Sequence, residues 1–267
     1  MAYEACAEAP VRAGVEKPCA APADEPARAP SIDRLMLAGE VRRSLPLFHD
    51  RVGAGRELAR ALRSERPLEP VVFGLARGGV EVAAEVALAL DAPLDAVAVR
   101  KVGHPWQPEY ALGAVAAYGG VYVRAPDGLS EEELAYVVAR ARRDAAALAA
   151  RLHRDQPPID PAGRSVILVD DGLATGSTMI AAVRWATTGG ASRIVAAVPV
   201  AARQSLASIE SEADEVVCPH VLDELESVGQ WYRRFGQLDD GDVVRLLAEN
   251  RGRASITPRR SSRGSRH

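Results

Sequence analysis

Short apolar runs alternate with amphipathic segments through the middle of the chain. The apolar runs predict strands at 70–76, 93–100, 164–170, 192–200 and 213–219, and segments with helical spacing lie between them. The run at 164–170 is apolar on both faces, which is typical of a central parallel strand. This alternation predicts an α/β fold with an open, mostly parallel five-stranded sheet flanked by helices.

A hairpin and several helices complete the pattern. Residues 111–124 are expected to form two strands joined by Gly119-Gly120, a common pair in hairpin turns. Ser130 and Glu133 have the spacing of a capping box, which predicts the start of a long helix. Other helices are predicted at 53–66, 80–90, 177–190, about 201–210 and 239–250.

The two ends of the chain differ from the middle in composition. Residues 1–40 are rich in Ala and Pro, and residues 251–267 are rich in Ser and Arg. Neither end has a repeating apolar pattern, so both are predicted to be disordered extensions. We therefore expect one folded domain over 41–250.

Composition and charge argue against several classes of protein. The net charge of −3 gives no general attraction to nucleic acid, and no run reaches the about 18 apolar residues of a membrane helix. The N-terminus has no apolar core of a secretory signal. Cys6, Cys19 and Cys218 lack metal-binding or C-x-x-C spacing. We expect a cytoplasmic protein that binds neither nucleic acid nor membrane.

The most specific chemistry lies in the segment SVILVDDGLATGSTM, residues 165–179. Asp170 and Asp171 follow the central strand, at the end of the sheet where open parallel sheets bind ligands. Backbone N–H groups at the start of the next helix favour an anion. The loop has no Walker A lysine and no G-x-G-x-x-G pattern, which favours a single phosphate. The loop residues are Ala174, Thr175, Gly176, Ser177 and Thr178.

Two carboxylates beside an anion-binding loop need a partner other than the phosphate. Carboxylates accept hydrogen bonds from a sugar diol, and they attract Mg²⁺ or its waters. A phosphate on the loop and a diol on Asp170 and Asp171 together describe a ribose 5-phosphate. The alternative is an ordinary strand end followed by a helix cap, which is a less specific interpretation of the same residues.

The run from Val166 to Thr178 resembles the phosphoribosyl-pyrophosphate signature of type I phosphoribosyltransferases. Gly172 departs from that signature, which more usually has a branched apolar residue there, and the departure bears on the flexibility of the loop. The resemblance extends over roughly 45–250 and is greatest to uncharacterised bacterial proteins of this kind. It implies the fold of that family, with a flexible hairpin loop and a small hood, here about 219–236.

The resemblance also implies roles for the two acids and for the loop. Asp170 and Asp171 would bind the ribose hydroxyls, and Mg²⁺ through water, while residues 174–178 would bind the 5-phosphate. Homodimers are usual in the family. The reaction would be displacement at C1 of the ribose, with charge on the departing pyrophosphate stabilised by Mg²⁺ and by cationic side chains.

Two other segments could supply those cations. Arg77, Gly78 and Gly79 follow a predicted strand and could bind pyrophosphate oxygens, although an ordinary glycine turn is the alternative. Their place matches the pyrophosphate loop of the family. Arg100 and Lys101 are expected to leave a strand and enter a polar, proline-containing loop at 99–114. This loop resembles the mobile catalytic loop of the family, which closes over the site.

Three functions remain open at this point. The first is Mg²⁺-dependent transfer of ribose 5-phosphate from phosphoribosyl pyrophosphate to a small nitrogenous acceptor. The second is hydrolysis or dephosphorylation of a phosphoribosyl compound, and the third is a regulator that binds phosphoribosyl pyrophosphate without catalysis. The loop cations favour the enzyme. His104 and Glu109 are chemically able to transfer protons, but the sequence assigns neither of them a role.

The aromatic segment near the C-terminus allows two interpretations. Trp231, Tyr232 and Phe235 could stack on an acceptor base or pack a helix onto the sheet. Packing is favoured, because the W-x-x-x-F spacing would place two rings on one helical face.

Overall fold

The computed structural model describes residues 46–63, 69–107, 110–124 and 128–256. All of them belong to the unit Leu35–His267, one of two into which the chain divides. The predicted N-terminal extension at 1–40 and the end of the predicted tail, 257–267, lie outside the described residues.

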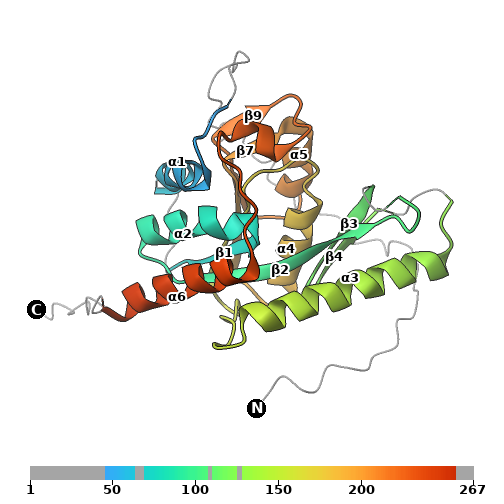
Figure 1. Ribbon diagram of the computed structural model, residues 1–267, viewed down its shortest axis with the longest axis horizontal. Coiled ribbons are helices and arrows are strands. Elements are labelled where there is room, and N and C mark those ends of the chain that lie inside the picture. The colour runs from blue at the N-terminus through green and yellow to red at the C-terminus, as the bar shows by residue number, and fades with distance from the viewer. Residues whose placement is uncertain (1–45, 64–68, 108–109, 125–127, 257–267) are drawn as a thin grey trace, which may run out of the picture. The chain divides into compact units, whose positions relative to one another are not determined.

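A seven-stranded sheet forms the centre of this unit, in the order β4-β3-β2-β1-β5-β6-β8 (Figure 1). The strands from β2 to β8 in this order run parallel to one another, as the alternation predicted. The predicted number of five is wrong, because the hairpin of β3 and β4 continues the same sheet through antiparallel pairing with β2. The strands are β1 (Val71–Ala76), β2 (Leu94–Gly103), β3 (Ala111–Ala116), β4 (Gly119–Val123), β5 (Ser165–Val169), β6 (Arg193–Ala197) and β8 (Glu215–Val217).

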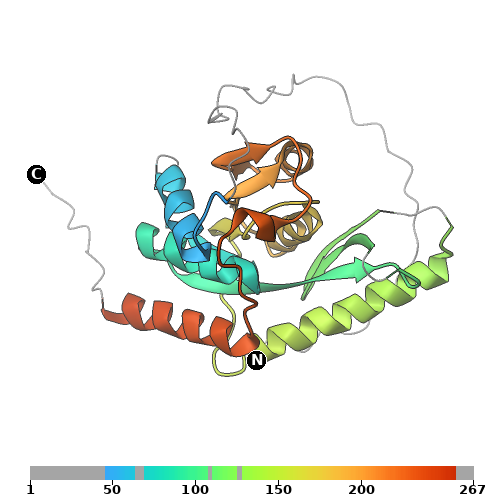
Figure 2. The same cartoon turned by 45° about the horizontal axis from the view of Figure 1, so that its top comes forward.

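Helices cover both faces of the sheet (Figures 1 and 2). The core on one face includes side chains of α1, α2, α3 and α6, and the core on the other face includes those of α4 and α5. Each helix buries an apolar stripe against the sheet or a neighbouring helix, which stabilises it. The helices are α1 (Arg51–Arg63), α2 (Gly78–Leu90), α3 (Glu131–Leu152), α4 (Ser177–Thr188), α5 (Arg203–Glu210) and α6 (Asp240–Ile256).

The ends of two helices test local sequence signals. Ser130 and Glu133 form the predicted capping box at the start of α3: the Ser130 hydroxyl accepts from Glu133 N, and the Glu133 carboxylate accepts from Ser130 N. Helix α6 continues to Ile256, so the predicted start of a disordered tail at residue 251 falls inside a helix.

A small second cluster forms where the hood is expected. The predicted strand at 192–200 is split: β6 ends at Ala197, and β7 (Val200–Ala202) pairs instead with β9 (His220–Leu222) in a separate two-stranded sheet. A 3-10 helix, η2 (Val228–Trp231), follows. The cluster comprises Phe48, Ala54, Val200, Ala202, Leu222, Leu225, Trp231 and Tyr232.

The aromatic side chains of this segment mostly serve packing. Trp231 and Tyr232 are buried, and the Tyr232 ring lies 5.2 Å from that of Phe48. The packing interpretation is therefore confirmed for these two residues. The helix assumed for it is wrong, because η2 ends at Trp231 and Phe235 is 39% exposed beyond it.

Cys218, just after β8, provides a pH-dependent prediction. Burial raises the pKa of this thiol to about 12, and the thiol donates a hydrogen bond to the carbonyl of His220. Because alkylation requires the thiolate, the native thiol should react roughly 1000-fold more slowly at pH 8 than an ordinary cysteine. The rate of iodoacetamide labelling is measured on a Cys6→Ser/Cys19→Ser variant, once for the native protein and once for the protein unfolded in urea. Equal rates in both conditions contradict it.

In the part of the chain that the structure describes, none of the helices is both long enough and apolar enough to cross a bilayer.

Candidate functional site

The predicted site residues meet at the carboxyl ends of β1 and β5, which are adjacent parallel strands. Asp170 and Asp171 follow β5, while Gly78 and Gly79 follow β1 and open α2. Glycine is needed for this close approach. A methyl group at Gly78 would lie 2.2 Å from Asp171 Oδ2, and one at Gly79 would lie 2.5 Å from the carbonyl oxygen of Val169. The two acids and the glycine turn therefore form one surface.

The predicted phosphate loop lies beside this surface and opens α4. Gly176 adopts a left-handed conformation, with a φ of 74°, and has no side chain with which to cap the helix. The first N–H groups of α4 are thus available to an anion. The Thr175 and Ser177 hydroxyls lie 3.4 Å apart, and the Ser205 hydroxyl holds the carbonyl of Ala174 at 2.6 Å.

Asp170 is the less constrained of the two acids. Its Oδ1 accepts a hydrogen bond from the N–H of Asp171 at 2.9 Å, and its Oδ2 has a long contact of 3.4 Å with the Thr178 hydroxyl. Burial raises the pKa of Asp170 well above its usual range, and the charge of Asp171 raises it further. Lys101 opposes this pKa shift. A carboxylate in such a place favours a proton or a cation.

Asp171 is held by Arg51, which the sequence analysis did not name, and by Tyr232, for which it proposed a different role. Arg51 Nε donates to Asp171 Oδ2 at 2.8 Å, and the Tyr232 hydroxyl donates to the main-chain carbonyl of Asp171 at 2.6 Å. Burial raises the pKa of Asp171, while Arg51 opposes that increase. The sequence signal for Arg51 was weak: α1 begins at Arg51, two residues before the predicted start at 53, and a cation at the start of a helix opposes the helix dipole and so needs a compensating partner.

The segment 232–240 connects η2 to α6 and passes the start of α2 (Figure 2). Its oxygen atoms accept from three arginines in turn. The carbonyl of Gly236 accepts from Arg51, and that of Leu238 accepts from Arg77 at 3.0 Å. The carboxylate of Asp240 then lies 3.2 Å from Arg77 Nε and 2.7 Å from Arg151 Nε. Arg77, a predicted pyrophosphate ligand, is thus held by this segment.

Arg100 and Lys101 lie within β2, which continues to Gly103. The expectation that they enter a loop is therefore wrong, because both pair with β3: Arg100 lies opposite Val115 and Lys101 opposite Ala114. Successive residues of a strand point to opposite faces. Lys101 acts electrostatically on Asp170. Burial lowers the pKa of Arg100, and the nearby charge of Arg77 lowers it further.

The two adjacent cations therefore have different surroundings, one near the acids and one near Arg77. The connection between β2 and β3 follows these two residues in the chain. His104 Nδ1 accepts from the N–H of Trp106 at 3.3 Å, and Glu109 lies outside the described residues.

The packing around Gly172 explains why this position departs from the family signature. It is buried, and a methyl group there would lie 2.7 Å from a Val228 methyl carbon and 3.2 Å from one of Val200. Val228, which belongs to η2, therefore occupies the space that a branched side chain at position 172 would need.

We expect Gly172→Val to destabilise the protein by about 1–3 kcal/mol, because the added atoms overlap Val228. Val228→Ala in the same chain should recover most of that loss, although the same change alone leaves a cavity and destabilises. Urea denaturation of the two single variants and the double variant measures this. If the two single effects simply add in the double variant, Val228 does not occupy the space next to Gly172.

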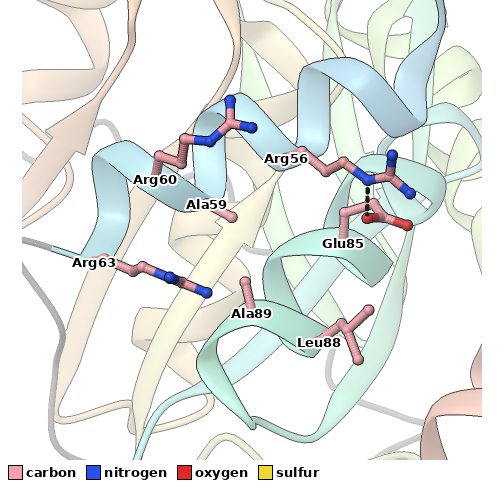
Figure 3. A pocket seen from close by; sticks show the side chains of 7 residues that line it. All are labelled: Arg56, Ala59, Arg60, Arg63, Glu85, Leu88 and Ala89. Carbon is pink, nitrogen blue, oxygen red and sulfur yellow. Dashed lines mark hydrogen bonds and ion pairs between the residues drawn. The ribbon is translucent and has the colours of Figure 1, made fainter.

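A surface pocket of about 330 Å³ lies elsewhere, between α1 and α2 (Figure 3). None of the predicted site residues lines it, and its one acid, Glu85, is paired with Arg56 at 3.0 Å. The candidate site is therefore defined by its chemistry and not by this pocket. The lining residues are Arg56, Ala59, Arg60, Arg63, Glu85, Leu88 and Ala89.

The fold and this edge define an open α/β protein in which paired acids, a glycine turn and a phosphate-type loop converge. The family model of the phosphoribosyl transferase domain matches residues 49–229, and the chain belongs to this family. The predicted resemblance is thereby confirmed.

Two relatives illustrate the match. The chain is 41% identical over 215 residues to "Putative phosphoribosyl transferase Rv0571c" of Mycobacterium tuberculosis. That alignment covers 76% of this chain and 47% of the relative, so the chain spans about half the length of the curated relatives it matches. The crystal structure of TT1426 from Thermus thermophilus is 42% identical, with a TM-score of 0.65, over 76% of this chain and 98% of that one.

Proposed function

We propose that the protein is a Mg²⁺-dependent phosphoribosyltransferase. It moves the ribose 5-phosphate of phosphoribosyl pyrophosphate to a small nitrogenous acceptor and releases pyrophosphate. One observation carries the proposal: Asp170 and Asp171 lie against the Gly78-Gly79 turn and next to the loop at 174–178, at one edge of the sheet. Membership of the phosphoribosyl transferase domain family supports it.

Each part of this edge suits one part of the donor. The N–H groups at the start of α4 and the hydroxyls of Thr175, Ser177 and Thr178 would bind the 5-phosphate. The carboxylates of Asp170 and Asp171 would accept hydrogen bonds from the ribose hydroxyls. Pyrophosphate would lie on the N–H groups of the glycine turn and on Arg77, whose guanidinium has further donors beyond those already used.

The two acids also fit a magnesium ion. Both have a raised pKa, which reflects buried negative charge that a cation would neutralise. When bound by Asp170 and Asp171 through water, Mg²⁺ would supply positive charge to the departing pyrophosphate.

The remaining chemistry requires positioning and charge, and no protein nucleophile. A bond forms between the acceptor nitrogen and C1 of the ribose while the bond from C1 to the pyrophosphate oxygen breaks, with inversion. Lys101, near Asp170, and Arg100, near Arg77, would stabilise the charge that develops on the pyrophosphate. The β2–β3 pair that carries them would limit access of water. By analogy with the family, we also propose that the protein is a cytoplasmic homodimer. Analytical ultracentrifugation would test whether it is a dimer.

The test is to incubate the protein with Mg²⁺ and phosphoribosyl pyrophosphate, first alone and then with a panel of nitrogenous bases. Acceptor-dependent release of pyrophosphate is the expected result. Release of inorganic phosphate would indicate the hydrolytic alternative, and binding without turnover would indicate a regulator. Either outcome would overturn the transferase.

A further inference from the structure

Arg51 is a buried cation to which the proposed reaction gives no role. Its side chain is 7% exposed, although it is the first residue of α1. It reaches Asp171, which is 120 residues further along the chain, and Gly236, which is 185 residues away. It therefore connects the acidic strand end to the segment 232–240.

The burial of this guanidinium is compensated by specific partners. A buried charge is costly unless it is paired and hydrogen-bonded, and the α1 dipole adds to the cost at this position. Nε donates to Asp171 at 2.8 Å, and Nη1 donates to the Gly236 carbonyl at 2.7 Å. The guanidinium carbon lies 3.8 Å from the centre of the Phe235 ring, and Glu81 lies 3.9 Å from Nη1. Its orientation is thus determined from several sides.

These contacts make the two acids unequal. Asp171 Oδ2 is occupied by Arg51, the Asp171 carbonyl is occupied by Tyr232, and the carboxylate fills the space left by the absent side chain of Gly78. Among the residues that the structure describes, the hydrogen-bond partner of Asp170 Oδ2 is Thr178, at a long 3.4 Å. Rotation of the Asp171 carboxylate would break the short ion pair, whereas Asp170 can accept from a ligand through Oδ2 while its Oδ1 keeps the hydrogen bond from the N–H of Asp171.

We propose that Arg51 is a positioning residue of the ligand site. It fixes the Asp171 carboxylate against the glycine turn, and Asp170 is thereby the acid that contributes most to binding a cation and the ribose. The identity of the ligand rests on the proposed function, whereas the contact between Arg51 and Asp171 is independent of it.

The competing view is that Arg51 only joins α1 to the segment 232–240 and stabilises the fold. The two views differ in energetic coupling. If Arg51 acts through Asp171, substituting Asp171 should change the affinity for the ligand little once Arg51 has been removed. This is because the effects of substitutions within one network of contacts are not additive. Asp170 should retain its full effect in both backgrounds.

The experiment measures the affinity of the protein for ribose 5-phosphate in the presence of Mn²⁺, a readout that needs no turnover. We expect Arg51→Ala to weaken binding about tenfold. Added guanidinium at a few tens of millimolar should restore part of that loss, and Arg51→Lys should be intermediate. Arg56→Ala is the matched control, since Arg56 lies on the same helix, is 63% exposed and pairs with Glu85.

A double-mutant cycle then decides the issue. Asp171→Asn should weaken binding clearly in the parent protein and hardly at all in Arg51→Ala, whereas Asp170→Asn should weaken it equally in both. Equal effects of Asp171→Asn in both backgrounds overturn the proposal, as does Arg51→Ala with unchanged affinity. If the parent protein does not bind the probe, the proposed function fails. The link between Arg51 and Asp171 is then judged separately by urea unfolding of the same cycle, where additive effects on stability overturn it.

Discussion

We expect Asp170→Asn to reduce turnover sharply and to make the ligand-free protein more stable. The loss of activity, about 100-fold or more in kcat/KM, follows if Asp170 supplies the charge that binds the ribose and its cation, as proposed above. The gain in stability follows from the raised pKa of Asp170, whose largest cause is burial and whose second cause is Asp171. Asparagine keeps the shape of the side chain and removes the unfavourable charge. We expect an increase of about 1 kcal/mol in the free energy of unfolding at neutral pH.

The pH dependence of this gain has a definite sign. Since the folded pKa of Asp170 is above the unfolded value, the folded state holds its proton to higher pH. The contribution of Asp170 to stability is therefore fully present below the unfolded pKa, and it is lost as pH rises through the folded pKa. The difference between the parent and the variant should vanish near pH 4 and grow toward pH 7.

Urea denaturation between pH 4 and pH 8, together with the turnover assay, checks both parts. Asp155→Asn is the control, since Asp155 is 64% exposed and pairs only weakly with its neighbour Arg154 at 3.3 Å. A stable variant that retains turnover would show that Asp170 does not hold the substrate. A variant less stable than its parent at pH 7 would show that the charge of Asp170 is compensated.

Gly79→Ala should have the second large effect, on both stability and ligand binding. A methyl group there would lie 2.5 Å from the Val169 carbonyl oxygen and 2.9 Å from the Cα of Asp170. Both neighbours are main-chain atoms at the end of a central strand, so they cannot yield as a side chain would. We expect a loss of about 1–3 kcal/mol in stability. Affinity for the donor should fall about 100-fold, because the turn is displaced from the acids.

Gly53→Ala is the matched control for this substitution. Gly53 lies inside α1, and a methyl group there would find only Asp50 Oδ1, at 3.5 Å. Alanine should stabilise the protein at this position, by roughly 0.5–1 kcal/mol, because it lowers the backbone entropy of the unfolded chain. Denaturation and calorimetric titration compare the two variants. Equal stability of Gly79→Ala and the parent would mean that the turn does not contact β5 as described.

The parts of the site that were predictable are those whose residues are adjacent in the chain. Asp170, Asp171 and the loop at 174–178 form a continuous segment between a strand and a helix, so their place at one edge of the sheet can be predicted from spacing alone. Arg51 and Tyr232 are 120 and 61 residues from Asp171, and only the folded chain brings them together. A single arginine in an arginine-rich chain carries too little information to predict such a contact.

The end of β2 shows a second limit of sequence reasoning. The apolar pattern is interrupted at Arg100 and Lys101, so the strand is predicted to end at Arg100 and a polar loop to follow. Hydrogen bonding to β3 continues the strand to Gly103 in spite of their polarity. Val102, Ala114 and Val115 are fully buried around these two cations, so the strand continues because its apolar residues and its pairing with β3 outweigh two polar side chains.

The segment 232–240 has a thermodynamic consequence. Through the carbonyls of Gly236 and Leu238 and the carboxylate of Asp240, one stretch of backbone engages Arg51 on the side of the acids and Arg77 on the side of the glycine turn. A ligand that shifts this segment must disturb both arginines. Thermodynamic linkage then makes the effect reciprocal. If such a ligand changes the affinity for phosphoribosyl pyrophosphate by some factor, phosphoribosyl pyrophosphate changes the affinity for that ligand by the same factor. Order of addition would leave the final occupancy of both ligands unchanged.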